Sequence, residues 1–260
     1  DRLRSRGLGD VYKRQALALF DELIGELARV NRNLVAVIIS GNAVAMPWVN
    51  EVPAIVEAWY GGTEAGNAIA SVLAGEVNPS GKLPFTFPVR LEDNPAIALD
   101  AYPGDGKQVK YKEGIFVGYR WNDRERIKPL FCFGHGLSYT TFEYGKVTAE
   151  GRQMGPDGTI TVSVPVKNTG SRAGAEIVQL YVSDLKSSLP RPVKELKGFR
   201  KITLQPGQEQ TVSFTIDRKA LSFYDDTKQD WVAEPGTFEA LVGASACDIR
   251  GKAAFELTAR

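Results

Sequence analysis

Adjacent carboxylates, a single histidine and two cysteines are the side chains of this sequence that could do chemistry. Asp225 and Asp226 form the most obvious acidic pair. Two carboxylates that cleave a glycosidic bond with retention lie on either side of that bond, about 5 Å apart. Sequence neighbours in a turn cannot straddle a sugar, so we expect Asp225 and Asp226 to serve turn formation.

His135 is the only histidine, so any Ser-His-Asp or Cys-His arrangement must include it. Cys132, three residues away, is the nearest thiol. Both residues lie in a Gly-rich segment with aromatic neighbours, which favours a structural imidazole hydrogen-bonded to loop backbone. One histidine and one cysteine cannot complete a zinc site, so no metal is predicted.

A glycine-rich turn from Gly61 to Gly66 follows an apolar run and precedes a helical pattern, where a phosphate-binding loop could lie. The Rossmann spacing and the Walker lysine are both absent, and Glu64 would occupy the positive end of the helix dipole. We therefore interpret this segment as a packing turn.

Composition excludes several classes of function. The 260 residues are 43% hydrophobic and 24% charged, as in a soluble globular protein of two ordinary domains. Net charge is +1, with 32 basic and 31 acidic residues spread along the chain. The sequence thus has no excess or cluster of basic residues of the kind that binds nucleic acid or an anionic membrane.

Cys132 and Cys247 are too few for a disulfide scaffold, and we expect two unpaired small hydrophobes. No apolar run reaches the ~18 residues of a membrane span, and the sequence leaves the compartment open.

The first fifteen residues, Asp1 to Gln15, are basic and lack helical period, which is typical of a non-native or disordered leader.

The part from Ala16 to Tyr144 predicts an α/β domain. Apolar residues from Leu17 to Val30 have helical spacing, and Leu34 to Ile39 is a β-branched run typical of a buried parallel strand. Ala54 to Tyr60 predicts a second strand. The helix that follows should run from Glu64 to about Ala74, with Thr63 as its cap and Gly75 at its end, and Lys82 to Pro88 should be an extended segment. The α/β part is short for a free-standing domain, and we expect its first half to be missing.

From Gly145 to Arg260 the pattern is all-β, with no convincing helix. Short strands separated by Pro-Gly or Asp-rich turns predict an immunoglobulin or fibronectin type sandwich. The predicted strands are Thr159 to Lys167, Glu176 to Val182, Lys197 to Leu204, Thr211 to Ile216 and Thr237 to Val242.

The stretch from Tyr111 to Tyr144, here called the aromatic joint, connects the two parts. It carries too many aromatic and aliphatic residues for a solvated linker, so it should pack against both neighbours and dock them rigidly.

Several motifs in and around the joint resemble those of one family. EGIFVGYRW and KPLFCFGHGLSYTTFEY resemble the connection between an α/β sandwich domain and a fibronectin type III-like domain in family-3 glycoside hydrolases. AWYGGTEAGNAIASVLAGEVNPSGKLPFTFP upstream, and RPVKELKGFRK, LQPGQ, ALSFYDD and WVAEPGTFEALVGAS downstream, extend the match. It covers nearly everything from Ala16 onward.

The resemblance implies the C-terminal part of a retaining β-glucosidase-like enzyme, which hydrolyses terminal β-linked glucosyl or xylosyl residues when intact. The family takes its Asp nucleophile from an N-terminal β/α barrel. It typically takes its Glu acid/base from upstream of the segment matching Leu17 to Ser40. We therefore assign no catalytic, cofactor-binding or metal residue and no cofactor. The implied partners are the barrel and a β-linked glycoside, with no nucleic acid or membrane.

A second hypothesis is a non-catalytic module that presents aromatic residues to a carbohydrate or another protein. Trp121, Tyr224 and Trp231 are its candidates, although aromatic residues at strand and joint positions are more often core. An exposed coplanar row would favour binding, and a buried set would favour a structural role.

Overall fold

The computed structural model describes residues 19–102 and 107–259. The chain forms two compact units, the first ending at Ser71 and the second beginning at Val72. The leader expected over residues 1–15 lies outside the described residues. The fold class is confirmed: an α/β part precedes an all-β part.

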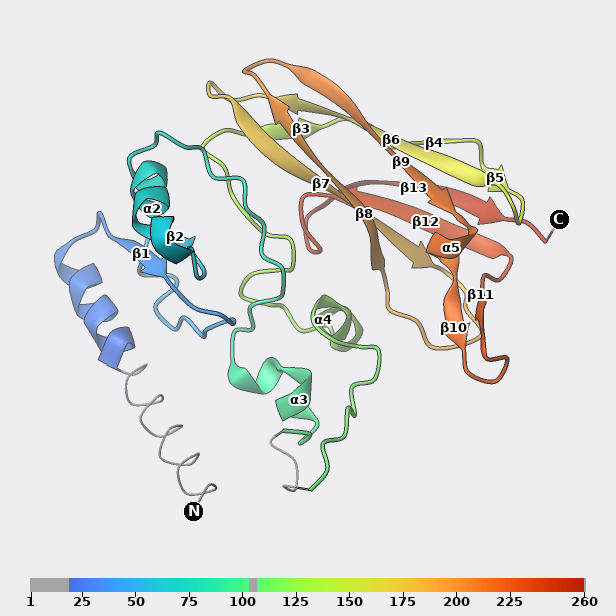
Figure 1. Ribbon diagram of the computed structural model, residues 1–260, viewed down its shortest axis with the longest axis horizontal. Helices are drawn as coiled ribbons and strands as arrows, with labels where there is room; N and C mark the ends of the chain where they lie inside the picture. Colours follow the sequence, from blue (N-terminus) through green and yellow to red (C-terminus); the bar gives the residue numbers. More distant parts are fainter. Residues whose placement is uncertain (1–18, 103–106, 260) are drawn as a thin grey trace. The chain divides into compact units, whose positions relative to one another are not determined.

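The first unit contains a helix over residues 19–30 and a parallel pair of strands (Figure 1). Strand β1 (Val35–Ile38) pairs with β2 (Ala54–Glu57) in a register that sets Ile38 opposite Glu57. The indole N–H of Trp48 donates to Asp21 on the helix at 2.9 Å. Both strands and the helix therefore follow the predicted order, with strands shorter than the apolar runs.

The predicted helix cap is wrong in detail. A 3₁₀ turn, η1 (Gly62–Glu64), precedes helix α2 (Ala65–Leu73), and no side chain caps this turn. Thr63 lies inside it rather than before the helix. Gly75, with φ of +75°, follows the helix as expected, because left-handed backbone costs glycine nothing.

Short helical segments lead to the sandwich in the second unit. These are η2 (Leu91–Asp93), α3 (Pro95–Ala98) and α4 (Tyr119–Glu125). Asn94 caps α3 by accepting from the Ala96 N–H at 3.0 Å, and Pro95 occupies the first helical position. The extended segment predicted over Lys82 to Pro88 forms one isolated antiparallel bridge, Phe87 with Phe131.

Two antiparallel sheets form the sandwich (Figure 1). The first sheet has the strand order β5-β13-β12-β7-β8. Its strands are β5 (Gln153–Met154), β7 (Gly174–Asp184), β8 (Glu195–Leu204), β12 (Gly236–Gly243) and β13 (Ile249–Leu257). Only the pairing of β5 with β13 in this sheet is parallel. The second joins β3 (Phe142–Tyr144), β4 (Thr148–Glu150), β6 (Thr159–Asn168) and β9 (Glu209–Asp217) around β6.

A core of alternating residues fills the space between these sheets. On β6, Ile160, Val162, Val164 and Val166 are all buried, while their neighbours are exposed or half-buried. Each such side chain contributes about 1.5–3 kcal/mol when it leaves water. All five predicted strands are confirmed, and helix α5 (Arg218–Leu221) corrects the expectation of no helix after Tyr144.

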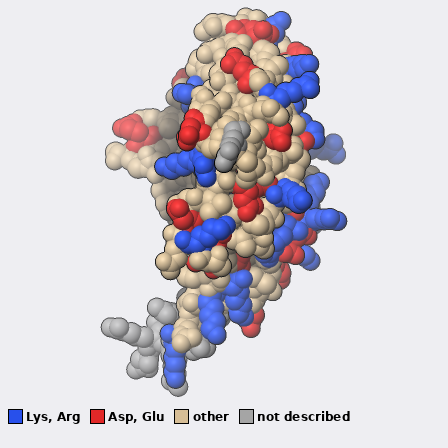
Figure 2. Space-filling model, turned by 90° about the vertical axis from the view of Figure 1, so that its right-hand side faces the viewer, with Lys and Arg blue, Asp and Glu red and all other residues tan. Residues whose placement is uncertain are grey.

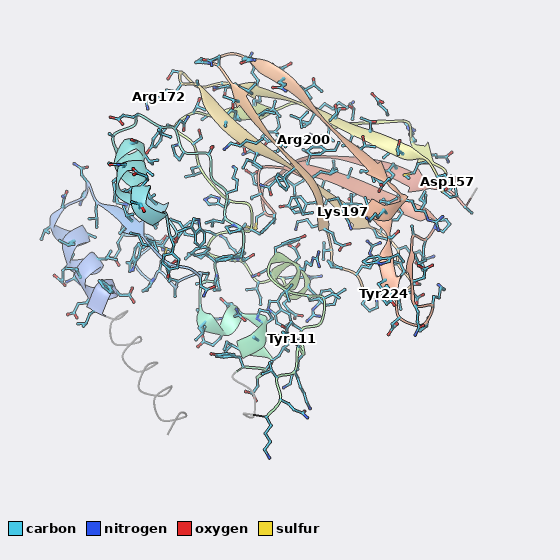
Figure 3. All side chains as sticks on the ribbon, in the orientation of Figure 1. Tyr111, Asp157, Arg172, Lys197, Arg200 and Tyr224 are labelled. Atoms are coloured by element: carbon cyan, nitrogen blue, oxygen red, sulfur yellow. A yellow bond between two sulfur atoms is a disulfide. The ribbon has the colours of Figure 1, made fainter. Side chains whose placement is uncertain are left out.

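The aromatic joint is fastened to the sandwich at several points. Tyr119 packs edge-to-face on Tyr181 of β7, with ring centroids 5.9 Å apart, and accepts a hydrogen bond from the Leu196 N–H of β8. Other joint residues stay in water, including Tyr111, which is 81% exposed (Figure 3). Docking on the sandwich side is thus confirmed. The domain limits 16–144 and 145–260 stay a prediction.

Charged side chains of both signs are mixed over the face that Figure 2 shows. This distribution agrees with the near-balance of acidic and basic residues in the sequence. In the described part of the chain, no helix is long and apolar enough to cross a membrane.

Candidate functional site

A cavity of about 420 Å³ opens in the second unit beside helix α4. Its lining comes from α4 and the turn after it, from the segments around Thr86 and Cys132, from the residue just before β8, and from the turn after β12. The lining residues are Thr86, Tyr119, Asn122, Asp123, Arg126, Ile127, Lys128, Pro129, Cys132, Lys194, Ala246 and Cys247.

Residues with positive φ stand at both ends of α4. Gly118 enters the helix with φ of +57°, and Arg126 ends it in the left-handed conformation with φ of +56°. Glycine adopts such a φ readily, whereas arginine does so at a steric cost. The Asn122 side chain closes the end of the helix by donating to the Ile127 carbonyl at 3.3 Å.

An ion pair forms part of the cavity wall. Lys194 Nζ and Asp123 Oδ2 are 2.5 Å apart, and their side chains are 9% and 21% exposed. Asp123 is the only carboxylate among the described residues that line the cavity. Glycoside hydrolysis by two carboxylates therefore has no basis in this lining.

Cys132 and Cys247 form a disulfide at the cavity, with Cα atoms 6.0 Å apart. The expectation that the two cysteines are unpaired is thus wrong. Sequence reasoning missed the pairing because 115 positions separate the two residues, and only the packing of the joint on the sandwich brings them together.

His135 lies beside the disulfide segment, with its ring stacked on Phe131 at 5.4 Å between centroids. Burial, with a smaller contribution from the nearby Lys82 charge, lowers the pKa of its imidazole. Within the described part of the chain, His135 forms hydrogen bonds through its main chain, whose N–H donates to the Cys132 carbonyl and whose carbonyl accepts from the Leu83 N–H. A structural role is supported, although not through the predicted imidazole hydrogen bond. Cys132, as half of a disulfide, offers no thiolate nucleophile.

Glu57 is an ionisable residue that the sequence analysis did not single out. It ends strand β2, at the carboxyl edge of the parallel pair, where open α/β sheets bind their ligands. Burial raises the pKa of Glu57, opposed by hydrogen bonds from Trp59 and Ser40. Glu57 lies in the middle of the predicted strand Ala54 to Tyr60, and an acidic residue within that apolar run was the available signal.

Asp225 confirms the turn interpretation. It is buried and accepts hydrogen bonds from the Thr227 N–H, the Thr227 hydroxyl and the Lys228 N–H. The ion pair with Lys228 at 2.8 Å and the Thr227 hydroxyl lower the pKa of Asp225 well below its usual range.

The three aromatic candidates do not lie together as one platform. Trp121 is buried, under the guanidinium of Arg124 at 4.7 Å. Tyr224 (Figure 3) and Trp231 lie opposite each other on the hairpin β10 (Phe223–Asp225) and β11 (Asp230–Val232), exposed at 51% and 64%. Their ring planes meet at 71°, so they are not coplanar.

Within residues 19–102 and 107–259, no cluster of three or more His, Cys, Asp or Glu side chains could hold a metal ion. The Gly61 to Gly66 segment contains the 3₁₀ turn η1 and the first two residues of α2. A Cβ on Gly61 would come within 2.9 Å of the Ala65 side chain, so close packing requires glycine there.

Comparison with known proteins matches the two parts to two family models. Residues 5–119 match the glycosyl hydrolase family 3 C-terminal domain, and residues 176–246 match a fibronectin type III-like domain. The first match begins inside the segment expected to be a leader.

Curated relatives match the chain over most of its length. The chain is 58% identical over 238 residues to β-glucosidase BoGH3A of Bacteroides ovatus, covering 91% of this chain and 32% of that protein. It is 51% identical over 229 residues to thermostable β-glucosidase B of Acetivibrio thermocellus, covering 88% of this chain and 30% of that one. The chain thus spans about a third of the length of these relatives.

Solved structures agree with this assignment. The β-glucosidase of Kluyveromyces marxianus in complex with glucose superposes with a TM-score of 0.86 at 42% identity, covering 92% of this chain and 28% of that one. The chain therefore carries the C-terminal domain of glycosyl hydrolase family 3, followed by a fibronectin type III-like domain.

Proposed function

We propose that this chain is the C-terminal part of a retaining β-glucosidase, which hydrolyses terminal β-linked glucosyl or xylosyl residues when intact. The observation that carries the proposal is the 58% identity to a β-glucosidase over 91% of this chain. Retaining hydrolysis needs a nucleophile and an acid/base on either side of the glycosidic bond. We assign neither to residues 1–260. In this proposal, both come from chain upstream of the segment matching Leu17 to Ser40, the nucleophile from a β/α barrel.

The chain by itself should not hydrolyse glycosides. Without two positioned carboxylates, binding groups alone leave the barrier close to its uncatalysed height. Assay of the purified 260-residue chain with an aryl β-glucoside should give no turnover above buffer. The proposal would be contradicted if the chain turned over this substrate and if Glu57→Gln or Asp123→Asn abolished the turnover. That result would place a catalytic carboxylate in this chain.

The gene upstream of this sequence gives an independent test. An open reading frame that continues upstream into a barrel with an Asp nucleophile supports the enzyme. A start codon near Ala16 contradicts it. Expressing the whole upstream region, with the barrel and the first part of the α/β domain, together with this chain should then produce aryl β-glucosidase activity that neither part has alone.

A carbohydrate-binding or protein-binding module is the second candidate function. The exposure of Tyr224 and Trp231 favours it, because large aromatic side chains in water often mark contact surfaces. The 71° angle between their planes argues against both rings stacking on one flat sugar face. Titration of a soluble β-glucan while Trp231 fluorescence is followed against Trp231→Phe tests this function separately from hydrolysis.

A further inference from the structure

The cavity beside α4 carries unbalanced positive charge. Arg126, Lys128 and Lys194 line it, against the single carboxylate of Asp123. Asp123 is paired with Lys194, which leaves two cationic side chains at the cavity. Arg126 and Lys128 are exposed, and neither has an ion pair within the described residues. An anionic group on a ligand would be attracted to this side of the cavity.

The rest of the cavity lining suits a ring with hydroxyl groups. Asp123 accepts hydrogen bonds and the Lys194 ammonium has three N–H donors, so the pair can receive a hydroxyl that both donates and accepts. Tyr119, Pro129 and the Cys132–Cys247 disulfide add apolar surface to the lining. A few convergent polar groups on an apolar lining are typical of small-molecule sites of this size.

These wall residues are also held in place before any ligand arrives. The Tyr119 ring stacks on Phe133 at 5.1 Å between centroids, and its hydroxyl accepts from the Leu196 N–H at 2.9 Å. The disulfide ties the segment around Cys132 to the turn after β12. A preformed wall reduces the ordering cost that binding must offset.

We propose that this cavity binds a small ring carboxylate of the size of a sugar acid. Arg126 and Lys128 receive its carboxylate, the Asp123–Lys194 pair receives its hydroxyl groups, and the apolar wall contacts its ring. The site does not depend on the proposed hydrolysis, because its lining offers only one carboxylate. Its test can therefore fail or succeed whatever the outcome of the glycosidase assay.

Titration of the 260-residue chain with D-glucuronate, D-glucose and inorganic phosphate tests the site, with binding followed by calorimetry and by amide NMR shifts. We expect saturable binding of glucuronate with shifts at α4 and around Lys194. D-Glucose should bind more weakly, since it lacks the carboxylate. Raising the salt from about 0.05 M to about 0.5 M should weaken glucuronate binding, because the cationic side chains are exposed.

Arg126→Asn/Lys128→Gln is the matched variant, because asparagine tolerates the left-handed backbone at position 126 and both side chains lie in water. It should weaken glucuronate binding about three- to tenfold, the sum expected of two exposed charge contacts. The control Lys146→Gln/Arg152→Gln removes one lysine and one arginine outside the cavity lining and should leave affinity unchanged.

Three results would overturn the proposal. If glucuronate does not bind, the cavity is not a binding site for sugar acids. If glucose and glucuronate bind equally well, the cationic side chains do not contribute to recognition. Phosphate binding as tight as glucuronate, with equal losses in both double variants, would indicate nonspecific anion attraction.

Discussion

Buried charges in the second unit are satisfied by partners from other segments. Arg191 lies between Asp184 at 3.0 Å and Glu195 at 2.8 Å, and also donates to the Leu221 carbonyl. Its side chain is 7% exposed and that of Asp184 is 3% exposed. Burial by itself would raise the pKa of Glu195, but the hydrogen bond from Arg191 and the charge of Lys197 (Figure 3) hold this pKa below its usual value.

Arg191→Met should destabilise the chain by about 3–5 kcal/mol, because it leaves Asp184 buried without its cation. Urea unfolding followed by circular dichroism measures this loss. Lys252→Met is the control: it removes an ion pair with Glu239 in which the lysine side chain is 63% exposed, and should cost less than about 1 kcal/mol. Equal effects of the two substitutions would contradict the assigned role of Arg191.

His135 should make stability depend on pH. Because its folded-state pKa is lowered from 6.5, the unfolded chain takes up a proton first as the pH falls. The stabilisation from neutral His135 is therefore present above about pH 6.5 and is lost as the pH falls through the folded-state pKa. Lys82 opposes the charged form, Asp248 favours it, and Phe131 covers the ring.

His135→Gln removes this titration and should flatten the fall in urea midpoint between about pH 7.5 and about pH 5 relative to the unsubstituted chain. Carboxylates titrate in both proteins, so the difference between the two curves isolates the histidine. Parallel curves would show that His135 has the same pKa in the folded and unfolded chains.

At the scale of elements, close contacts hold the aromatic joint to the sandwich. Gly134 has φ of +79°, and a Cβ there would lie 2.2 Å from the Gln179 side chain of β7. Gln179 donates to the Gly134 carbonyl at 3.1 Å and to the Ala244 carbonyl at 2.8 Å. One amide on β7 thereby connects the joint to the turn after β12.

The disulfide should be the strongest single tie between the joint and that turn. It closes a loop of 115 positions, so removing it with Cys132→Ser/Cys247→Ser should cost about 4–5 kcal/mol. Thermal unfolding with and without reductant measures this. Reductant should lower the midpoint of the unsubstituted chain and leave that of the double variant unchanged. A reductant-insensitive unsubstituted chain would show that the two thiols are not paired in solution.

At the scale of the molecule, the sandwich has a core of its own. The buried hydrophobic cluster draws its members from Val147 to Leu257, entirely within the predicted fibronectin type III-like domain. Several partners of residues in this domain nevertheless lie before Gly145. Lys194 pairs with Asp123, Cys247 with Cys132 and Gln179 with Gly134.

We therefore expect a fragment of residues 145–260 to fold, but with lower stability than a fragment of residues 72–260. Cutting at Gly145 leaves the buried Lys194 ammonium and the Gln179 amide without these partners, which costs about 1–3 kcal/mol for each neutral group and more for the charge. Urea unfolding and amide exchange of both fragments compare them.

A fragment of residues 16–144 should aggregate, because the edges and faces of β1 and β2 would lack cover. A monomeric, well-protected 16–144 fragment beside an unfolded 145–260 fragment would contradict both expectations.

Local pattern determined the sandwich and the family. The alternation from Thr159 to Lys167 predicts β6 because side chains on a strand alternate between core and solvent. The turn residues around Gln205 and Asp225 separate strands for equally local reasons. Motifs such as EGIFVGYRW are contiguous, so the resemblance needed no knowledge of contacts.

Only tertiary structure decided the partners of the charged and thiol groups. Asp123 and Lys194 lie 71 positions apart, and Cys132 and Cys247 lie 115 apart. Neither pairing leaves a periodic or spacing signal, because each depends on how the joint lies against β7, β8 and the turn after β12. The cavity beside α4 could not be predicted for the same reason: its lining comes from segments that meet only when the chain folds.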